Sequence, residues 1–247
     1  MALYLIFSAL RLAHNPTDKL LPSLATIGDT LYRIAILPDA RTGQVQLWLD
    51  TGASLVRLGL GLALATLVGL VFGIATGLVP YARAALSPFI AVISMIPPMA
   101  VLPILFVTLG LDELSKVVLI MIGVAPFLIR DLAMRVEEMP SELLIKAQTL
   151  GASTWQIVLR IVLPQILPKL IDAVRLSLGP AWLFLISAEA IAAQDGLGYR
   201  IFLVRRYLAM DVILPYVAWI TLLAFLMDLA LRLVTRRWFP WRAQARS

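Results

Sequence analysis

The sequence predicts an all-α fold, a polytopic membrane helical bundle of about five to six spans in one domain. Of the 247 residues, 61% are hydrophobic and 15% are charged, whereas an ordinary soluble domain is about one-quarter charged. Several apolar stretches reach the roughly 20 residues that a spanning helix needs, and the chain can hold five or six of them with short loops.

The first 50 residues are predicted to form a short N-terminal span and an extracytoplasmic amphipathic segment. Residues 1–12 are apolar, but they are shorter than a full span and lack the basic start of a signal peptide. They are therefore either the tilted end of a span or part of one that begins upstream. Charged and apolar residues then alternate irregularly as far as Asp50, and residues 24–36 are expected to form an amphipathic helix.

Residues 51–238 are predicted to form the transmembrane domain. Its five firm spans, each flanked by charge or by Pro and Gly, lie at about 53–78, 86–109, 116–132, 173–193 and 216–234. The first span has small residues at four-residue steps, at Gly69, Gly73 and Gly77. A neighbouring helix can therefore approach it closely.

Prolines interrupt the second of these spans. Pro97, Pro98 and Pro103 each remove a backbone donor that protein or a water-filled cavity must replace. We therefore expect a broken helix near mid-membrane. It either lines a translocation path, with Ser94, Pro97 and Pro98 as candidate lining residues, or is merely kinked.

Basic residues predict the orientation of the chain. They flank the segment at 137–168 and follow the last span, and cytoplasmic loops carry the excess of Lys and Arg. Two spans separate these regions, so both can face the cytoplasm, and residues 239–247 are then a cytoplasmic tail. This pattern accounts for the net charge of +6, and we expect no nucleic-acid partner.

Residue composition argues against an enzyme. The chain has no cysteine and one histidine, and it contains no Gly-x-x-x-x-Gly-Lys-Ser/Thr loop and no His-Glu-x-x-His motif. We therefore expect no catalytic residue, metal site or cofactor on this chain.

Glu189 is the most informative of the few charged residues within the predicted spans. It lies late in an otherwise apolar segment. A carboxylate there is either a residue of the translocation path or the partner of an arginine on another helix. Asp172 and Arg175, three residues apart, are expected to form a local ion pair.

A polar, basic stretch separates the third and fourth firm spans. Lys146 and Arg160 would each lose their hydration in hydrocarbon, at about 2 to 4 kcal/mol or more per charge. The stretch therefore lies in water, where a soluble partner can reach it. We expect Gly151 to form a sharp turn with positive φ between two helices, and Pro164 to begin the second helix.

This stretch resembles the EAA loop of ABC importer permeases, whose pattern is Glu-Ala-Ala, three residues, Gly, nine residues, then Ile-x-Leu-Pro. The matching residues are Ala147, Gly151, Ile161, Leu163 and Pro164. Ile145 and Lys146 replace the leading Glu and Ala of the pattern, and Glu142, one turn upstream, is a candidate to replace that Glu.

The resemblance extends over residues 20–241 and is closest to the nitrate/sulfonate/taurine branch of binding-protein-dependent permeases. Shared elements are Leu21-Pro22-Ser23, Ser54-Leu55-x-Arg57, Ile96-Pro97-Pro98, Leu102-Pro103, Ala188-Glu189 and Gly196-Leu197-Gly198. The resemblance implies the type I ABC importer permease fold, multi-pass in the bacterial inner membrane. It also implies partners: a second permease copy in a homodimer, ATPase subunits that hold ATP and Mg, an extracytoplasmic substrate-binding protein, and the lipid bilayer.

The resemblance also implies roles for the residues of the polar loop. The ATPase is expected to couple through Ala147, Gln148, Gly151, Ala152, Ile161, Leu163 and Pro164. The expected substrate is a small polar solute such as nitrate, a sulfonate, taurine or bicarbonate, or one related to urea or guanidine. The alternatives are an ion-coupled secondary carrier, which normally has more spans or an inverted repeat, and a membrane enzyme.

Overall fold

The computed structural model describes residues 7–8, 10–11, 13–14, 19–39 and 43–240, so most of the predicted span at 1–12 and of the tail at 239–247 lies outside it. Among the described residues every regular element is a helix, which confirms the all-α prediction. The elements discussed below are α2 (Leu24–Ile36), α3 (Gln46–Leu78), α4 (Pro80–Ser94), α5 (Pro98–Leu109), α6 (Glu113–Glu137), α7 (Ser141–Thr149), α8 (Thr154–Ile157), the π-turn η1 (Val158–Val162), α9 (Leu163–Ala192), α10 (Leu197–Arg205) and α11 (Met210–Trp238).

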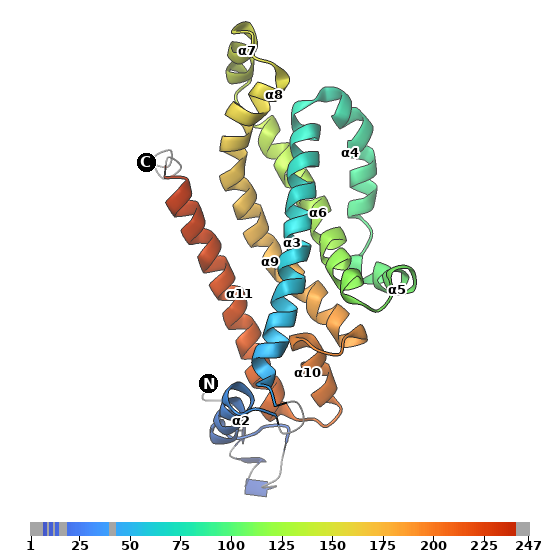
Figure 1. Cartoon of the computed structure of the whole chain (residues 1–247), viewed down its shortest axis with the longest axis vertical. Coiled ribbons are helices and arrows are strands. Elements are labelled where there is room, and N and C mark those ends of the chain that lie inside the picture. The colour runs from blue at the N-terminus through green and yellow to red at the C-terminus, as the bar shows by residue number, and fades with distance from the viewer. Residues whose placement is uncertain (1–6, 9, 12, 15–18, 40–42, 241–247) are drawn as a thin grey trace.

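The long helices α3, α6 and α9 lie side by side in an elongated bundle, and α11 flanks α9 (Figure 1). Helices α7 and α8 extend beyond one end of the bundle, whereas α2 and α10 lie at the opposite end. The main apolar core fills the space between α3, α6, α9 and α11, with Leu58, Ile120, Leu128 and Leu185 fully buried. Helix α2 has the bounds that the sequence predicts and begins at Ser23, whose hydroxyl accepts the amide of Thr26.

Glycines allow the closest helix contact in the fold, between α3 and α6. A Cβ added at Gly69 would lie 2.6 Å from the Cβ of Leu128, and one at Gly73 would lie 2.7 Å from that of Leu132. Such distances leave no room for any side chain. The predicted close approach at the small residues is thus confirmed, and the equal offset along both helices shows that α3 and α6 run parallel.

The predicted break in the second span lies between α4 and α5, which meet at 93°. Ser94 ends α4, and Pro97 is the N-cap of α5, with Pro98 in its first turn. Proline is tolerated in a first turn because the amide it lacks has no partner there. Pro103 lies inside α5 without ending that helix.

The span count among the described residues is lower than the five to six predicted. Three helices, α3, α6 and α11, are long and apolar enough to cross a membrane, and the α4–α5 pair can act as a fourth span. Helix α9, which contains the predicted span at 173–193, is 30 residues long, or about 45 Å. It carries Lys169, Asp172, Arg175 and Glu189, and charged side chains are costly in hydrocarbon.

Candidate functional site

Two regions at opposite ends of the bundle carry the polar residues singled out above. The first is formed by α7, the turn after it and α8, and we call residues 141–157 the α7–α8 arm. Gly151 has φ +80° and no heavy atom within 4 Å of an added Cβ. The backbone, not packing, therefore requires glycine there. The turn is closed by the Gly151 amide, which donates to the Gln148 carbonyl at 2.9 Å, and by the Ala152 amide, which donates to the Ala147 carbonyl at 3.0 Å.

A capping box begins the second helix of the arm. The Ser153 hydroxyl accepts the amide of Gln156, and the Gln156 side chain accepts the amide of Ser153. The helical run then continues through η1 into α9, so the expectation that Pro164 begins the second helix is wrong. Pro164 lies inside the run, just after a π-turn in which the Leu163 amide donates five residues back, to Val158.

The predicted coupling residues divide into those that pack inward and those that face outward. Ala147 is buried in a small core with Val136, Ile157 and Val162, against which Ala152, Ile161 and Leu163 pack. Pro164 is half-buried, whereas Gln148 is exposed beside Gly151. Most of the predicted set therefore holds the arm together, and a partner can touch only part of it.

Large apolar side chains cover the outside of the arm, and the sequence reasoning missed them. Leu150 is 79% exposed, Trp155 68% and Ile145 56%. Exposed aromatic and aliphatic residues on a protruding element are typical of a protein-binding surface. Their presence within an otherwise polar stretch was the signal that could have identified them.

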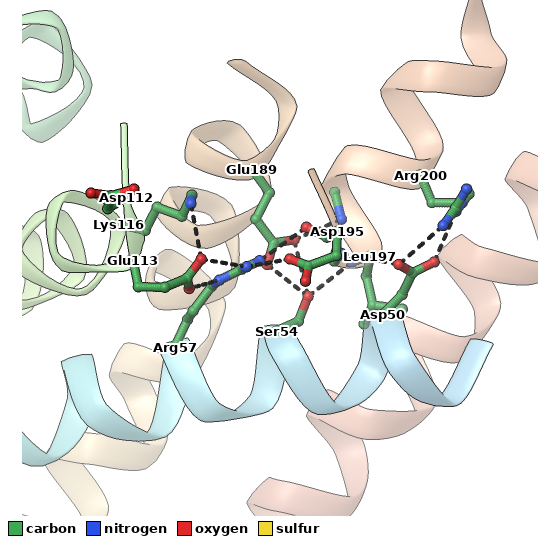
Figure 2. Close-up of polar contacts among 12 residues, drawn as sticks. Asp50, Ser54, Arg57, Asp112, Glu113, Lys116, Glu189, Asp195, Leu197 and Arg200 are labelled. Carbon is green, nitrogen blue, oxygen red and sulfur yellow. Dashed lines mark hydrogen bonds and ion pairs between the residues drawn. The ribbon is translucent and has the colours of Figure 1, made fainter. Parts of the chain in front are cut away.

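The second region is a buried cluster of charged and polar groups at the opposite end of the bundle, which we call the Arg57 cluster (Figure 2). Asp50, Ser54 and Arg57 lie on one face of α3, four and three residues apart. Each is less than 5% exposed. Their partners come from α6, α9, α10, the connection between α9 and α10, and α11, where the Tyr216 hydroxyl donates to Asp50 at 3.0 Å.

The Arg57 guanidinium is shared among three carboxylates. Its Nη1 donates to Glu189 Oε1 at 2.8 Å, and its Nη2 donates to Glu113 Oε1 at 2.8 Å. Nη2 also bonds the Asp195 carboxylate, and Nη1 donates to the Asp195 carbonyl at 3.0 Å. Lys116 supports Glu113 at 3.2 Å. The outer carboxylates Glu113 and Asp195 are more than half exposed, whereas Glu189 is fully buried.

Glu189 therefore has the arginine partner on another helix that the sequence left as one of two alternatives. It also accepts the Ser54 hydroxyl at 2.8 Å and the Gly198 amide at 2.8 Å. A fully buried carboxylate needs such partners, because burying an unpaired charge costs several kcal/mol.

The connection from α9 to α10 is held by three successive amides. The Gly196 amide donates to Asp50 at 3.0 Å, that of Leu197 to Ser54 at 2.9 Å, and that of Gly198 to Glu189. Gly196 has φ +110°, and an added Cβ there would lie 2.5 Å from a Glu189 oxygen. Glycine is thus required at position 196, because the backbone there has a positive φ and lies against the Glu189 carboxylate.

The other predicted path residues lie apart from this cluster. Ser94 hydrogen-bonds within its own helix, to the Ile90 carbonyl at 2.6 Å. Among the described residues, no hydrogen bond or ion pair joins Ser94, Pro97 or Pro98 to Glu189. The predicted pair of Asp172 and Arg175 forms at 3.1 Å, and Arg175 also pairs with Asp228 on α11 at 2.8 Å.

Comparison with known proteins identifies the family to which this architecture belongs. The sequence pattern of the family described as "Binding-protein-dependent transport system inner membrane component" matches residues 65–240. The chain belongs to this family. The permease is thus a multi-pass inner-membrane subunit of a transport system.

Relatives of the permease belong to the branch that the sequence resembles. It is 39% identical over 199 residues to the taurine transport system permease protein TauC of Escherichia coli, covering 80% of this chain and 72% of TauC. It is 29% identical to the putative aliphatic sulfonates transport permease protein SsuC of Bacillus subtilis, covering 90% and 78%. The nitrate import permease protein NrtB of Synechocystis is 27% identical, with 73% and 66% covered.

Solved structures agree with the fold of the permease. The inward-facing MetNI methionine ABC transporter matches with a TM-score of 0.67 at 22% identity, covering 76% of this chain and 94% of the other. A bacterial ABC transporter involved in the import of alginate matches with a TM-score of 0.65 at 16% identity, covering 94% and 95%. At these identities the match concerns the fold alone, and it confirms the type I ABC importer permease fold.

Proposed function

We propose that this permease forms the translocation path of an ATP-driven importer for a small solute that carries an oxyanion group, such as a sulfonate, taurine or nitrate. The names of its relatives support this class, because they refer to taurine, aliphatic sulfonates and nitrate. A separate substrate-binding protein delivers the solute, and a second permease copy completes the path. Ser94, Pro97 and Pro98 at the α4–α5 break are proposed to line it.

The observation that carries the coupling role is the α7–α8 arm. It protrudes from the bundle (Figure 1), it is packed through Ala147 and Ile157 on a small core shared with α3, α6 and α9, and it exposes Leu150 and Trp155. A rigid arm with an apolar outer surface suits a soluble ATPase that must both bind the permease and move it. ATP and Mg are held by that ATPase and not by this chain.

Coupling requires that the ATPase bind one state of the permease better than another, since a partner shifts an equilibrium only by its differential affinity. The arm can transmit this preference because its turn is closed by backbone hydrogen bonds on both sides of Gly151. The arm continues through η1 into α9. Movement of the arm is therefore passed directly to a helix that also holds Glu189.

The proposal is tested by purifying the tagged permease with its neighbouring ATPase and measuring ATP-driven uptake in proteoliposomes. We expect Gly151→Asp to keep membrane insertion and to abolish uptake, because a side chain at φ +80° strains the turn. The matched control is Gly28→Asp, since Gly28 is exposed on α2 with no atom near an added Cβ. Normal uptake by Gly151→Asp would contradict the coupling role.

The same preparation separates the importer from an ion-coupled secondary carrier. If the permease is part of an importer, a soluble ATPase is recovered with it in equimolar amount, and solute is taken up only when ATP is present. A carrier is recovered alone and takes up solute when an ion gradient is imposed without ATP. Uptake that follows the ion gradient would replace the proposal with the carrier.

A further inference from the structure

A pocket of about 370 Å³ lies beside α10, and its composition points to an anion. Its lining residues are Ala190, Tyr199, Phe202, Leu203, Arg205 and Arg206. It lies at the end of the bundle opposite the α7–α8 arm, where α10 packs against the end of α9 (Figure 1). The lining contains two arginines and no carboxylate.

The two arginines of the pocket, at the end of α10, differ from Arg200, which lies within that helix. Arg200 pairs with the buried Asp50, Nε to Oδ2 at 2.9 Å, and its side chain is 17% exposed. Arg205 and Arg206 are exposed. In the part of the chain that the structure describes, neither side chain has a hydrogen bond or an ion pair, and the Arg205 guanidinium only lies over the Phe202 ring, 5.4 Å from its centre.

Arginines at the end of a helix commonly bind its last carbonyls, but here the backbone already occupies those carbonyls. The Tyr207 amide donates to Val204 at 3.0 Å, and the Leu208 amide donates to Arg205 at 3.1 Å. This turn places Leu208 at φ +53°, the left-handed region that non-glycine residues rarely adopt. Among the described residues, neither guanidinium donates a hydrogen bond to these carbonyls.

Electrostatics at this helix end favours an anion overall. The carboxyl end of a helix carries about half a negative charge, whereas the two guanidiniums contribute two full positive charges. Planar guanidinium groups bind oxyanions through paired N–H donors. The rings of Tyr199 and Phe202 can cover the apolar part of a small organic anion.

Ala190 of the pocket lies on the same face of α9 as two exposed leucines. Ala190, Leu183 and Leu176 follow each other at seven-residue steps, so they share that face. Leu183 is 60% exposed and Leu176 68%. Leu176 lines a separate cavity of about 1020 Å³ near the other end of the bundle, where Arg175 and Arg232 are paired with Asp228.

We propose that the pocket between Arg205 and Arg206 binds the oxyanion group of the transported solute at the end of the permease opposite the α7–α8 arm. This inference rests on the proposed function for its substrate class. Within that function it assigns a binding site and the residues that select for negative charge. The phosphate of a lipid headgroup has related chemistry, so the test separates the two sources.

The test uses trifluoromethanesulfonate, a sulfonate visible by fluorine NMR, and the permease–ATPase complex in phosphatidylcholine nanodiscs. We expect the probe to bind the wild-type complex and the Arg205→Gln/Arg206→Gln variant to raise its Kd at least tenfold. The matched control is Arg33→Gln, which removes an exposed arginine from α2 at the same end of the bundle. Absence of probe binding, or equal binding by the double variant, would overturn the proposal.

Two further measurements decide whether the site serves the solute. Binding-protein-dependent uptake by the double variant should show a KM raised severalfold with an intact ATPase complex, whereas an unchanged KM would overturn the role. Probe binding that vanishes when anionic phosphatidylglycerol replaces zwitterionic phosphatidylcholine would assign the pocket to an anionic lipid headgroup instead. None of these outcomes changes the co-purification of the ATPase or the ATP-driven uptake by the wild type. Those two results test the proposed function separately from the pocket.

Discussion

Arg57 on α3 and Glu189 on α9 form a buried ion pair 132 positions apart in the sequence, with 2.8 Å between Nη1 and Oε1. Through Ser54 and the amides of the α9–α10 connection, this pair joins α3, α9 and α10. Glu113 extends it to α6. The pair therefore fixes the geometry of the bundle end that also contains the Arg205–Arg206 pocket.

Arg57→Met should strongly destabilise the permease, because it leaves Glu189 buried without its charge partner. The expected loss is about 3 to 5 kcal/mol, and thermal unfolding in detergent would reveal it as a lowered Tm. The control is Glu137→Gln, which breaks the ion pair of Glu137 with Arg83, in which both side chains are more than 40% exposed. That loss should be at most about 1 kcal/mol. Equal changes in Tm for the two variants would show that the buried pair contributes no more to stability than the exposed pair.

Gly196→Ala should disrupt the α9–α10 connection. The change puts a Cβ at φ +110° and within 2.7 Å of Arg57 Nη1, so both backbone strain and a clash oppose it. Gly179→Ala is the control, because Gly179 lies within α9 with nothing within 4 Å of an added Cβ. Size-exclusion profiles in detergent should show loss of monodisperse protein for the first variant only. A monodisperse Gly196→Ala protein with unchanged Tm would contradict the geometry.

Gly69→Ala should weaken the contact of α3 with α6, since the new methyl group overlaps Leu128 at 2.6 Å. Overpacking of this kind costs about 1 to 3 kcal/mol. Gly59→Ala, on the same helix with open space around it, should leave stability unchanged or slightly raised. Unfolding midpoints of the two variants measured side by side decide the point, and equal midpoints would speak against close packing at Gly69.

Trp155→Ala should reduce recovery of the ATPase without changing the stability of the permease. Trp155 is 68% exposed on the α7–α8 arm, and an aromatic anchor at the centre of an interface contributes about 2 kcal/mol or more, roughly 30-fold in Kd. Trp238, 69% exposed at the end of α11, provides Trp238→Ala as a matched control. Full ATPase recovery with Trp155→Ala would show that Trp155 is not part of the surface that binds the ATPase.

Local patterns in the sequence predicted several parts of this protein correctly. The helix at 24–36, the broken span at Pro97 and Pro98, and the close approach at Gly69 and Gly73 each depend on residues near one another in the chain. Such features follow from backbone chemistry and side-chain size, which act over a few residues. The EAA-like spacing likewise identified the α7–α8 arm, although the start of its second helix was misplaced because Ser153, and not Pro164, caps it.

The sequence by itself therefore determined the membrane class, the helical fold, the family and the position of the α7–α8 arm. Only the tertiary structure decided which partner Glu189 has, since Arg57 and Glu189 are joined by helix packing and not by spacing. It also decided that Leu150 and Trp155 face outward while Ala147 packs inward. The physical reason is the same in both cases: periodicity states which residues share a face of one helix, and packing between helices determines what that face meets.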